Sequence, residues 1–213
     1  MREKSRKVLR MPFMSEFVRG FLAFDIENED VTKKLTHMQT QAVQTGADLK
    51  LIEPENIHMT IRFLGDITLN IADKIFEEMK KIQFKSFPAQ LTGLGVFPSL
   101  NYPRVLWAGI AQGAEQLQNI VNQIEPKLQS LGFPPDRNPF SPHLTIARVR
   151  SAQNKAELAD FVSKNVKYDF GVVEAKCLRL KRSELTPKGP IYSTLKEYCP
   201  TQQQPKVTLC RKK

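Results

Sequence analysis

The sequence predicts an α+β fold, in which strands and helices follow one another in mixed order, in preference to a parallel α/β fold. Some segments alternate apolar and polar residues, as half-buried strands do, and others repeat apolar residues every third or fourth position, as amphipathic helices do. No glycine-rich phosphate loop of the Walker or Rossmann type is present. With 213 residues, the chain is long enough for one large domain or two small interlocked lobes.

The first part of the chain is expected to form three strands and two helices. The strands cover residues 17–26, 49–52 and 57–64, and the helices cover 31–44 and 67–82. Pro54-Glu55-Asn56 turns the chain before the third strand, and Gly65-Asp66 is expected to end it. The second helix has the clearest pattern, since apolar residues recur at every fourth position: Ile67, Ile71, Ile75 and Met79.

The second part is expected to add five strands and two helices. The strands cover residues 87–96, 104–110, 143–149, 168–181 and 191–198, and the helices cover 114–130 and 155–165. A Pro-rich loop over 132–139 precedes the strand that begins at His143. Pro126 is expected to kink or fray the end of its helix, because proline lacks the N–H that the helix needs.

The two ends of the chain differ from its middle. We expect residues 1–14 to be a flexible basic extension, 15–199 to be the folded domain and 200–213 to be a flexible polar and basic tail. No apolar run approaches the roughly 20 residues of a membrane helix, and no signal peptide is recognisable. A cytoplasmic protein that does not associate with membranes is therefore predicted.

The three cysteines are widely spaced, with no Cys-x-x-Cys pair: Cys177, Cys199 and Cys210. They are expected to be reduced and structural, since three thiols make no closed disulfide framework and lack a zinc-like spacing. The net charge of +10 and the pI near 9.6 favour a polyanionic partner such as RNA.

A weak internal repeat carries the functional information. His58-Met59-Thr60-Ile61-Arg62 follows a turn that contains proline, and His143-Leu144-Thr145-Ile146-Ala147-Arg148 follows Ser141-Pro142. The two histidines are 85 residues apart, and the chain has only three histidines. The third, His37, lies in a polar helix without such a motif and is interpreted as a surface residue.

The repeat predicts a pair of strands that each present an imidazole and a hydroxyl. Alternate residues of a strand share a face, so His58 and Thr60 point away from the core into which Met59 and Ile61 point. The same alternation holds for the strand of His143 and Thr145. If the two strands faced each other across a cleft, two imidazoles and two hydroxyls would surround one ligand.

This set of groups suits phosphoester chemistry. An imidazole titrates near neutrality, so one ring can act as the base while the other acts as the acid. Threonine hydroxyls can donate hydrogen bonds to phosphate oxygens. Arg62 shares the face of His58 on an ideal strand, whereas Arg148 needs a bulge or a strand end to reach the cleft. No metal site and no cofactor are predicted, because two histidines fall short of the usual three or four ligands.

At these motifs the sequence resembles the two-histidine (2H) phosphoesterases, in particular the RNA 2′,3′-cyclic phosphodiesterases, also called 2′–5′ RNA ligases. The resemblance covers residues 18–198. Besides the two His-x-Thr (HxTx) motifs, it rests on residues 54–58, 63–65, 95–98, 103–109 and 183–192.

The resemblance implies a bilobal α+β fold with two antiparallel sheets, helices packed outside them and one His-x-Thr strand from each lobe in a central cleft. It implies that His58 protonates the leaving 3′ oxygen, that His143 activates water, and that Thr60, Thr145 and Arg148 hold the phosphate. The expected substrate is RNA with a 2′,3′-cyclic phosphate end, with tRNA fragments as one candidate, and the expected state is a monomer. Ligation through a 2′–5′ link is the reverse reaction.

Two alternatives stay open from the sequence. The same cleft could belong to a non-catalytic RNA-binding module, although binding alone needs no pair of imidazoles. The same chemistry could also act on a small nucleotide that carries a cyclic phosphate. Trp107 and Phe97 are interpreted as core or cleft wall in preference to platforms for RNA bases.

Overall fold

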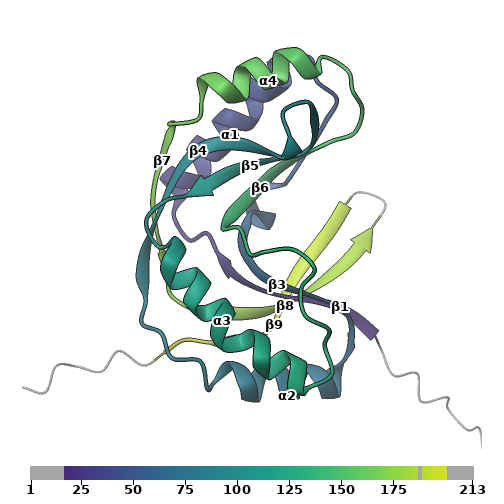
Figure 1. Ribbon diagram of the computed structural model, residues 1–213, viewed down its shortest axis with the longest axis vertical. Helices are drawn as coiled ribbons and strands as arrows, with labels where there is room; N and C mark the ends of the chain where they lie inside the picture. The colour runs from purple at the N-terminus through teal and green to yellow at the C-terminus, as the bar shows by residue number, and fades with distance from the viewer. Residues whose placement is uncertain (1–16, 187–188, 201–213) are drawn as a thin grey trace, which may run out of the picture.

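The computed structural model describes residues 17–186 and 189–200, which form an α+β fold with two antiparallel sheets (Figure 1). The four-stranded sheet has the order β3 (His58–Thr68), β1 (Phe17–Asp25), β8 (Leu178–Thr186) and β9 (Gly189–Tyr198). The five-stranded sheet has the order β2 (Leu49–Leu51), β6 (His143–Val149), β5 (Tyr102–Ile110), β4 (Phe87–Ser99) and β7 (Asp169–Ala175). The predicted α+β class with two antiparallel sheets is confirmed.

Four α-helices pack on the two sheets. α1 (Glu29–Gln44) and α4 (Lys155–Lys164) contact the five-stranded sheet, whereas α2 (Leu69–Met79) and α3 (Ala114–Ser130) contact the four-stranded sheet. Figure 1 shows α4 and α1 at one end of the molecule and α2 and α3 at the other. Asn28 caps α1, since its side chain accepts hydrogen bonds from two backbone N–H groups of the first turn. A short 3-10 helix, η1 (Pro54–Asn56), leads into β3.

The buried side chains form one continuous core that both sheets share. Leu22 of the four-stranded sheet and Leu144 of the five-stranded sheet are both fully buried members of it. The helices contribute their apolar stripes, as the sequence periodicity predicts, with Leu35, Ile75, Ile120 and Leu158 all fully buried. A shared core holds the two sheets in a fixed relation, which is what a site built from both of them requires.

Three expected elements differ from the structure. The strand expected over residues 168–181 is two strands, β7 and β8, which lie in different sheets. Apolar residues alternate on both sides of this crossover at Lys176 and Cys177, and no glycine or proline marks it. β3 does not end at Gly65-Asp66 but continues to Thr68. α3 has the expected bounds, but its end does not fray at Pro126, because the helix continues to Ser130.

The cysteine prediction was wrong for two of the three residues. Cys177 and Cys199 form a disulfide, with Cα atoms 4.3 Å apart. They flank the first pair of the β8–β9 ladder, in which Leu178 lies opposite Tyr198. The odd number of cysteines and the separation of 22 residues hid this pairing, because the proximity arises only when β9 returns beside β8.

The expected basic extension over residues 1–14 and most of the expected tail over 200–213 lie outside the described residues. In the part of the chain that the structure describes, none of the helices has the length and apolar character to cross a membrane.

Candidate active site

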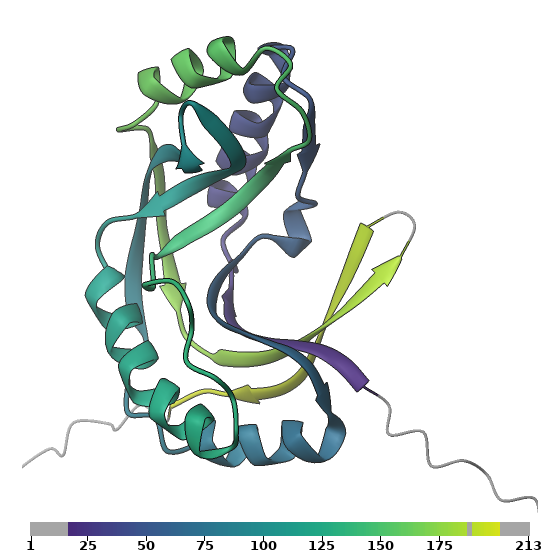
Figure 2. The same cartoon turned by 45° about the vertical axis from the view of Figure 1, so that its right-hand side comes forward.

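The two predicted histidines come from different sheets, on two strands that contact each other. His58 is the first residue of β3, and His143 is the first residue of β6. β3 and β6 contact each other, and Figure 2 shows them on the inner side of the curved molecule. The predicted alternation holds, since Met59 and Leu144 are buried while His58 and His143 are half-buried.

Each imidazole is held by the backbone two residues before it. Nδ1 of His58 lies 2.7 Å from the carbonyl oxygen of Asn56, and Nδ1 of His143 lies 2.7 Å from that of Ser141. Because a carbonyl oxygen only accepts, Nδ1 carries the proton in both rings. Nε2 of each neutral ring is then a free lone pair, which is the atom that acid–base chemistry needs.

Each histidine also packs between two aromatic rings. The ring of His58 lies 4.8 Å from that of Phe21 and 5.3 Å from that of Tyr192. The ring of His143 lies 4.9 Å from that of Phe97 and 6.3 Å from that of Trp107. Phe97 and Trp107 thus form the wall beside His143, as expected, and fix the orientation of its ring.

Burial favours the neutral form of both histidines. It lowers the pKa of His58 from 6.5 to about 4. The hydrogen bond to Asn56 opposes this shift, Lys181 adds to it, Asp25 opposes it, and the charge of His143 adds to it. Burial also lowers the pKa of His143, against the hydrogen bond to Ser141. The effect of the His143 charge on His58 means that the rings lie within electrostatic reach of each other.

The two threonines lie on the same faces as their histidines. Thr60 and Thr145 are both half-buried. Among residues 17–186 and 189–200, neither hydroxyl forms a hydrogen bond with another protein group, so both are available to a ligand. Each strand therefore presents an imidazole and a hydroxyl together.

A bulge in β6 places Arg148 on the same face of the strand as His143, which an ideal strand would not do. Leu106 of β5 pairs with Ala147, but Trp107 pairs with Thr145, so Ile146 has no partner on β5. Ile146 and Ala147 are both fully buried, and this extra residue returns Arg148 to the exposed face of His143.

Gln39 stabilises this bulge, and the sequence analysis missed it. Its side-chain amide is 2% exposed and donates hydrogen bonds to the carbonyl oxygens of Ile52 and Ile146, at 2.7 and 2.8 Å. A polar residue among the apolar positions of a helix was the only signal in the sequence.

Arg62 does not lie where the alternation placed it. β3 carries the same bulge as β6, because Leu22 pairs with Arg62 while Ala23 pairs with Thr60 and Ile61 is skipped. Arg62 therefore corresponds to the buried Ala147, and Phe63, not Arg62, corresponds to Arg148. The prediction that Arg62 faces the cleft like His58 was wrong, since an ideal strand has no bulge.

The guanidinium of Arg62 instead joins β3 to α3 and to the loop that leads to His143. Its Nε lies 3.0 Å from Oε2 of Glu125, and its Nη1 lies 3.5 Å from Oδ2 of Asp136. Nη2 donates to the carbonyl oxygen of Pro134 at 2.6 Å. The side chain is 10% exposed, so these groups use its hydrogen-bonding capacity.

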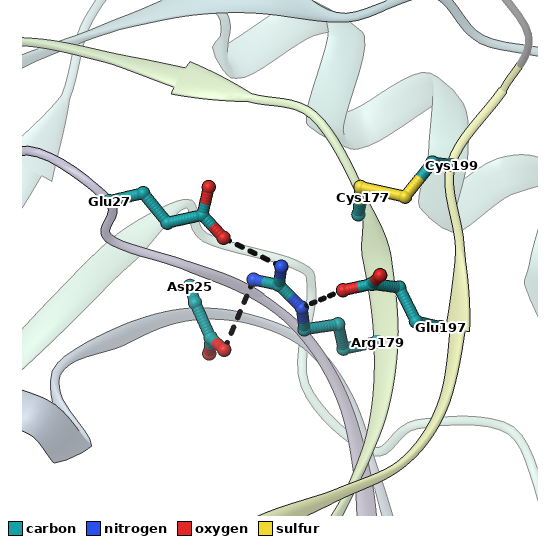
Figure 3. Close-up of a disulfide and its surroundings, with 6 residues drawn as sticks. All are labelled: Asp25, Glu27, Cys177, Arg179, Glu197 and Cys199. Carbon is teal, nitrogen blue, oxygen red and sulfur yellow. Dashed lines mark hydrogen bonds and ion pairs between the residues drawn. A yellow bond between two sulfur atoms is a disulfide. The ribbon is translucent and has the colours of Figure 1, made fainter.

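A second polar cluster lies beside the disulfide (Figure 3). Arg179 pairs with Asp25, Glu27 and Glu197, and Asp25 also pairs with the buried Lys181. The sulfur atoms of Cys177 and Cys199 lie close to the carboxylate of Glu197. In the disulfide form this trio lacks the thiolates that a metal ion would need, and Glu197 is engaged by Arg179.

Residues 20–198 match the family described as the AKAP7 2′5′ RNA ligase-like domain. An RNA 2′,3′-cyclic phosphodiesterase of Aeropyrum pernix is 39% identical over 164 residues, which are 77% of this chain and 93% of that protein. A protein of the same name from Methanocaldococcus jannaschii is 39% identical over 181 residues, covering 85% of this chain and all of that protein.

Solved structures agree with the fold. A Thermus thermophilus protein superposes with a TM-score of 0.71 at 27% identity, covering 85% of this chain and 97% of that one. Escherichia coli LigT in complex with 3′-AMP superposes with a TM-score of 0.73 at 21% identity, covering 88% of this chain and all of that one. The chain therefore belongs to the 2′5′ RNA ligase-like family of 2H phosphoesterases.

Proposed function

We propose that this protein hydrolyses the 2′,3′-cyclic phosphate at the end of an RNA to a 2′-phosphate. The observation that carries the proposal is the paired arrangement of His58 and His143. Each ring is fixed through Nδ1 to a backbone carbonyl and leaves Nε2 free, and the rings lie on β3 and β6, two strands of different sheets that contact each other. The family membership and the names of the relatives support the same reaction.

The two histidines, the two threonines and Arg148 each have a separate role in the proposed reaction. Nε2 of His143 takes a proton from water as the water oxygen attacks phosphorus. The bond from phosphorus to the 3′ oxygen breaks, and His58 gives this oxygen a proton, which leaves a 3′-hydroxyl and a 2′-phosphate. Thr60 and Thr145 donate hydrogen bonds to the phosphate oxygens, and Arg148 stabilises the charge that develops on them.

His58 can act as the acid only when its ring is protonated, and a bound substrate favours the protonated form. With a pKa of about 4, His58 is neutral in the free protein at neutral pH. A bound phosphate brings a negative charge next to the ring, and a nearby opposite charge favours the protonated form. We therefore propose that the substrate itself raises the pKa of the acid. The mechanism uses no metal ion or cofactor.

The test is hydrolysis in EDTA of an oligonucleotide that ends in a 2′,3′-cyclic phosphate, with the 2′-phosphate product identified by mass. His58→Ala and His143→Ala should each reduce turnover by about 10²- to 10⁴-fold while RNA affinity changes little. His37→Ala, on the exposed face of α1, is the matched control. Activity that is lost in EDTA and restored by zinc would overturn the mechanism, and unchanged turnover in both variants would leave RNA binding as the function.

Fragments of tRNA are candidate substrates, and we propose a monomer that acts in the cytoplasm. Disulfides are rare in the reducing cytosol, so the Cys177–Cys199 bond does not support this location. The support comes from the RNA substrate and the basic charge of the chain. In ligation, a 5′-hydroxyl would attack the cyclic phosphate in place of water and form a 2′–5′ link, and excess water disfavours this reaction.

A further inference from the structure

Two cysteines and one glutamate form a cluster on the β8–β9 ladder that the proposed reaction does not use. Leu178 pairs with Tyr198, and Cys177 and Cys199 lie just outside this pair, one on each strand. Glu197 shares a strand face with Cys199, since alternate residues of a strand point the same way. The two sulfur atoms and a carboxylate oxygen of Glu197 all lie within 4.8 Å of one another (Figure 3).

We propose that Cys177, Cys199 and Glu197 bind one Zn²⁺ ion when the disulfide is reduced. Two thiolates and a carboxylate are ordinary zinc ligands, and a water molecule completes the four-coordinate shell. Around a tetrahedral zinc ion the ligand atoms lie about 3.5 to 4 Å apart, as the usual bond lengths require. The three atoms of the cluster already lie within 4.8 Å of one another, so small rotations of the side chains suffice.

The disulfide must open before the ion binds, because a sulfur atom in a disulfide carries no negative charge. A dithiol reductant supplies two electrons, so that the S–S bond breaks, both cysteines gain a proton and the reductant becomes a disulfide. Each thiol then releases its proton as it binds the ion. Cys199 is exposed, so a reductant can reach it, and a reducing compartment such as the proposed cytoplasm favours the open form.

The β8–β9 ladder keeps the two thiols together after reduction. It runs from the pair of Leu178 and Tyr198 to the hairpin turn, so backbone hydrogen bonds hold β8 beside β9 without the disulfide. The Cα atoms of the two cysteines, which are 4.3 Å apart, therefore stay within reach of one ion. A site that is already assembled loses little conformational entropy when it binds.

Arg179 orients Glu197 and leaves one carboxylate oxygen to the ion. Its Nε contacts Oε2 of Glu197, and in the part of the chain that the structure describes this is the only ion pair of that glutamate. Oε1 is therefore available as a ligand. Asp25 and Glu27 hold the guanidinium in turn. Carboxylate ligands of metal ions usually have such a hydrogen-bonded partner, which fixes their orientation.

An acidic cavity of about 560 Å³ gives a cation access to the cluster. Glu197 is part of its lining. The charged side chains of the lining are four carboxylates and one guanidinium: Asp25, Glu27, Glu55, Glu197 and Arg179. This excess of negative charge raises the local concentration of cations. The ion and its water ligand can therefore enter from this side.

The test uses Co²⁺ as a spectroscopic probe for Zn²⁺, with the protein either oxidised or reduced by a phosphine. The reduced wild type should bind one Co²⁺ per chain with the charge-transfer absorption of cobalt–thiolate bonds, and Zn²⁺ should displace it. The oxidised protein should show no such absorption. The reduced protein should unfold about 5 to 10 °C below the oxidised one. Zn²⁺ should recover part of this shift in the reduced protein alone.

Variants of the reduced protein test the ligand set. Cys177→Ser should abolish the absorption, and Glu197→Gln should weaken binding at least about tenfold. The controls are Glu184→Gln, a glutamate of the same hairpin that also pairs with an arginine, and Cys210→Ser. Both should bind like the wild type. No absorption in the reduced wild type, equal binding by the oxidised protein, or equal losses in the controls would overturn the site. None of these measurements depends on turnover, so the proposed reaction is tested separately.

Discussion

Lys181 donates a hydrogen bond from Nζ to Oδ1 of Asp25 at 2.5 Å, in an ion pair that lies next to the strand of His58. The Lys181 side chain is only 7% exposed. The two charges act on His58 in opposite directions, since Lys181 lowers its pKa and Asp25 raises it, after burial has lowered it most. Burial therefore dominates the lowered pKa of His58, and the ion pair adjusts it through two opposed charges.

Lys181→Met should raise the pKa of His58. The variant removes a positive charge next to the ring, while Asp25 keeps a partner in Arg179 at 3.1 Å. In the pH profile of kcat/KM, the limb that reports His58 should therefore move to higher pH. Titration of the His58 ring by NMR would show the same shift directly. A profile that stays unchanged or moves to lower pH would contradict the proposed role of Lys181.

Asp25→Asn should cost more stability than Lys181→Met. It leaves the Lys181 ammonium buried with no carboxylate and also removes one partner of Arg179. Breaking a buried ion pair from one side costs about 3 kcal/mol or more. Urea denaturation of both variants at pH 7 compares the two losses. An equal or smaller loss for Asp25→Asn would mean that Lys181 finds another partner or loses its proton.

The stability of the protein should fall as the pH drops below 6.5. The folded state holds the pKa of His58 at about 4, against 6.5 in the unfolded chain, so the unfolded chain binds a proton more readily. The stabilisation is present in full above pH 6.5 and is lost towards pH 4, by up to about 3 kcal/mol. The lowered pKa of His143 acts in the same direction.

The contribution of His58 can be isolated with His58→Gln. Denaturation midpoints of the wild type and of this variant, measured between pH 7.5 and pH 4, separate the histidine from the carboxylates that titrate in the same range. The variant should lose less stability than the wild type over this interval. Parallel curves would show that His58 is protonated at the same pH in the folded and unfolded chains.

Most of the fold and the way the two candidate histidines lie on their strands could be predicted from the sequence. The alternation around His58 and His143 is local, and it survives folding because the buried aliphatics on the other face determine it. α3 and β6 have the predicted bounds, because the first has a long apolar stripe and the second follows a Pro-rich loop.

What could not be predicted depends on contacts between distant segments. The bulges at Ile61 and Ile146 decide that Arg148 lies on the face of His143 and that Arg62 does not lie on the face of His58, and they become visible only against β1 and β5. The Cys177–Cys199 disulfide and the Asp25–Lys181 pair likewise join residues of different strands. The apolar pattern of one segment does not show which residues of a distant strand will lie beside it.

Arg62→Met should impair catalysis through the loop before His143. The variant removes the ion pairs to Glu125 and Asp136 and the hydrogen bond to the carbonyl of Pro134. Stability should fall by about 2 to 3 kcal/mol. Because the loop holds the carbonyl that orients His143, kcat should fall about tenfold with little change in RNA affinity. Arg137→Met, an exposed residue of the same loop, is the control and should change neither quantity.

Gln39→Leu should act on the reaction through Arg148, although Gln39 lies in α1. Without the amide, the carbonyl oxygen of Ile146 keeps only its hydrogen bond from the Ile52 N–H, and the bulge that aims Arg148 loses a support. We expect a stability loss of about 1 to 3 kcal/mol and a fall in kcat/KM of about tenfold. Thr40→Leu, the exposed neighbour on α1, is the control.

A double-mutant cycle separates this role from general destabilisation. If Gln39 acts by orienting Arg148, then Gln39→Leu should have little further effect on kcat/KM once Arg148 is alanine, because there is no guanidinium left to aim. If the bulge is merely structural, the two losses should multiply. If the two losses in kcat/KM multiply in a double variant that is still folded at the assay temperature, then the effect of Gln39 on the reaction does not depend on Arg148.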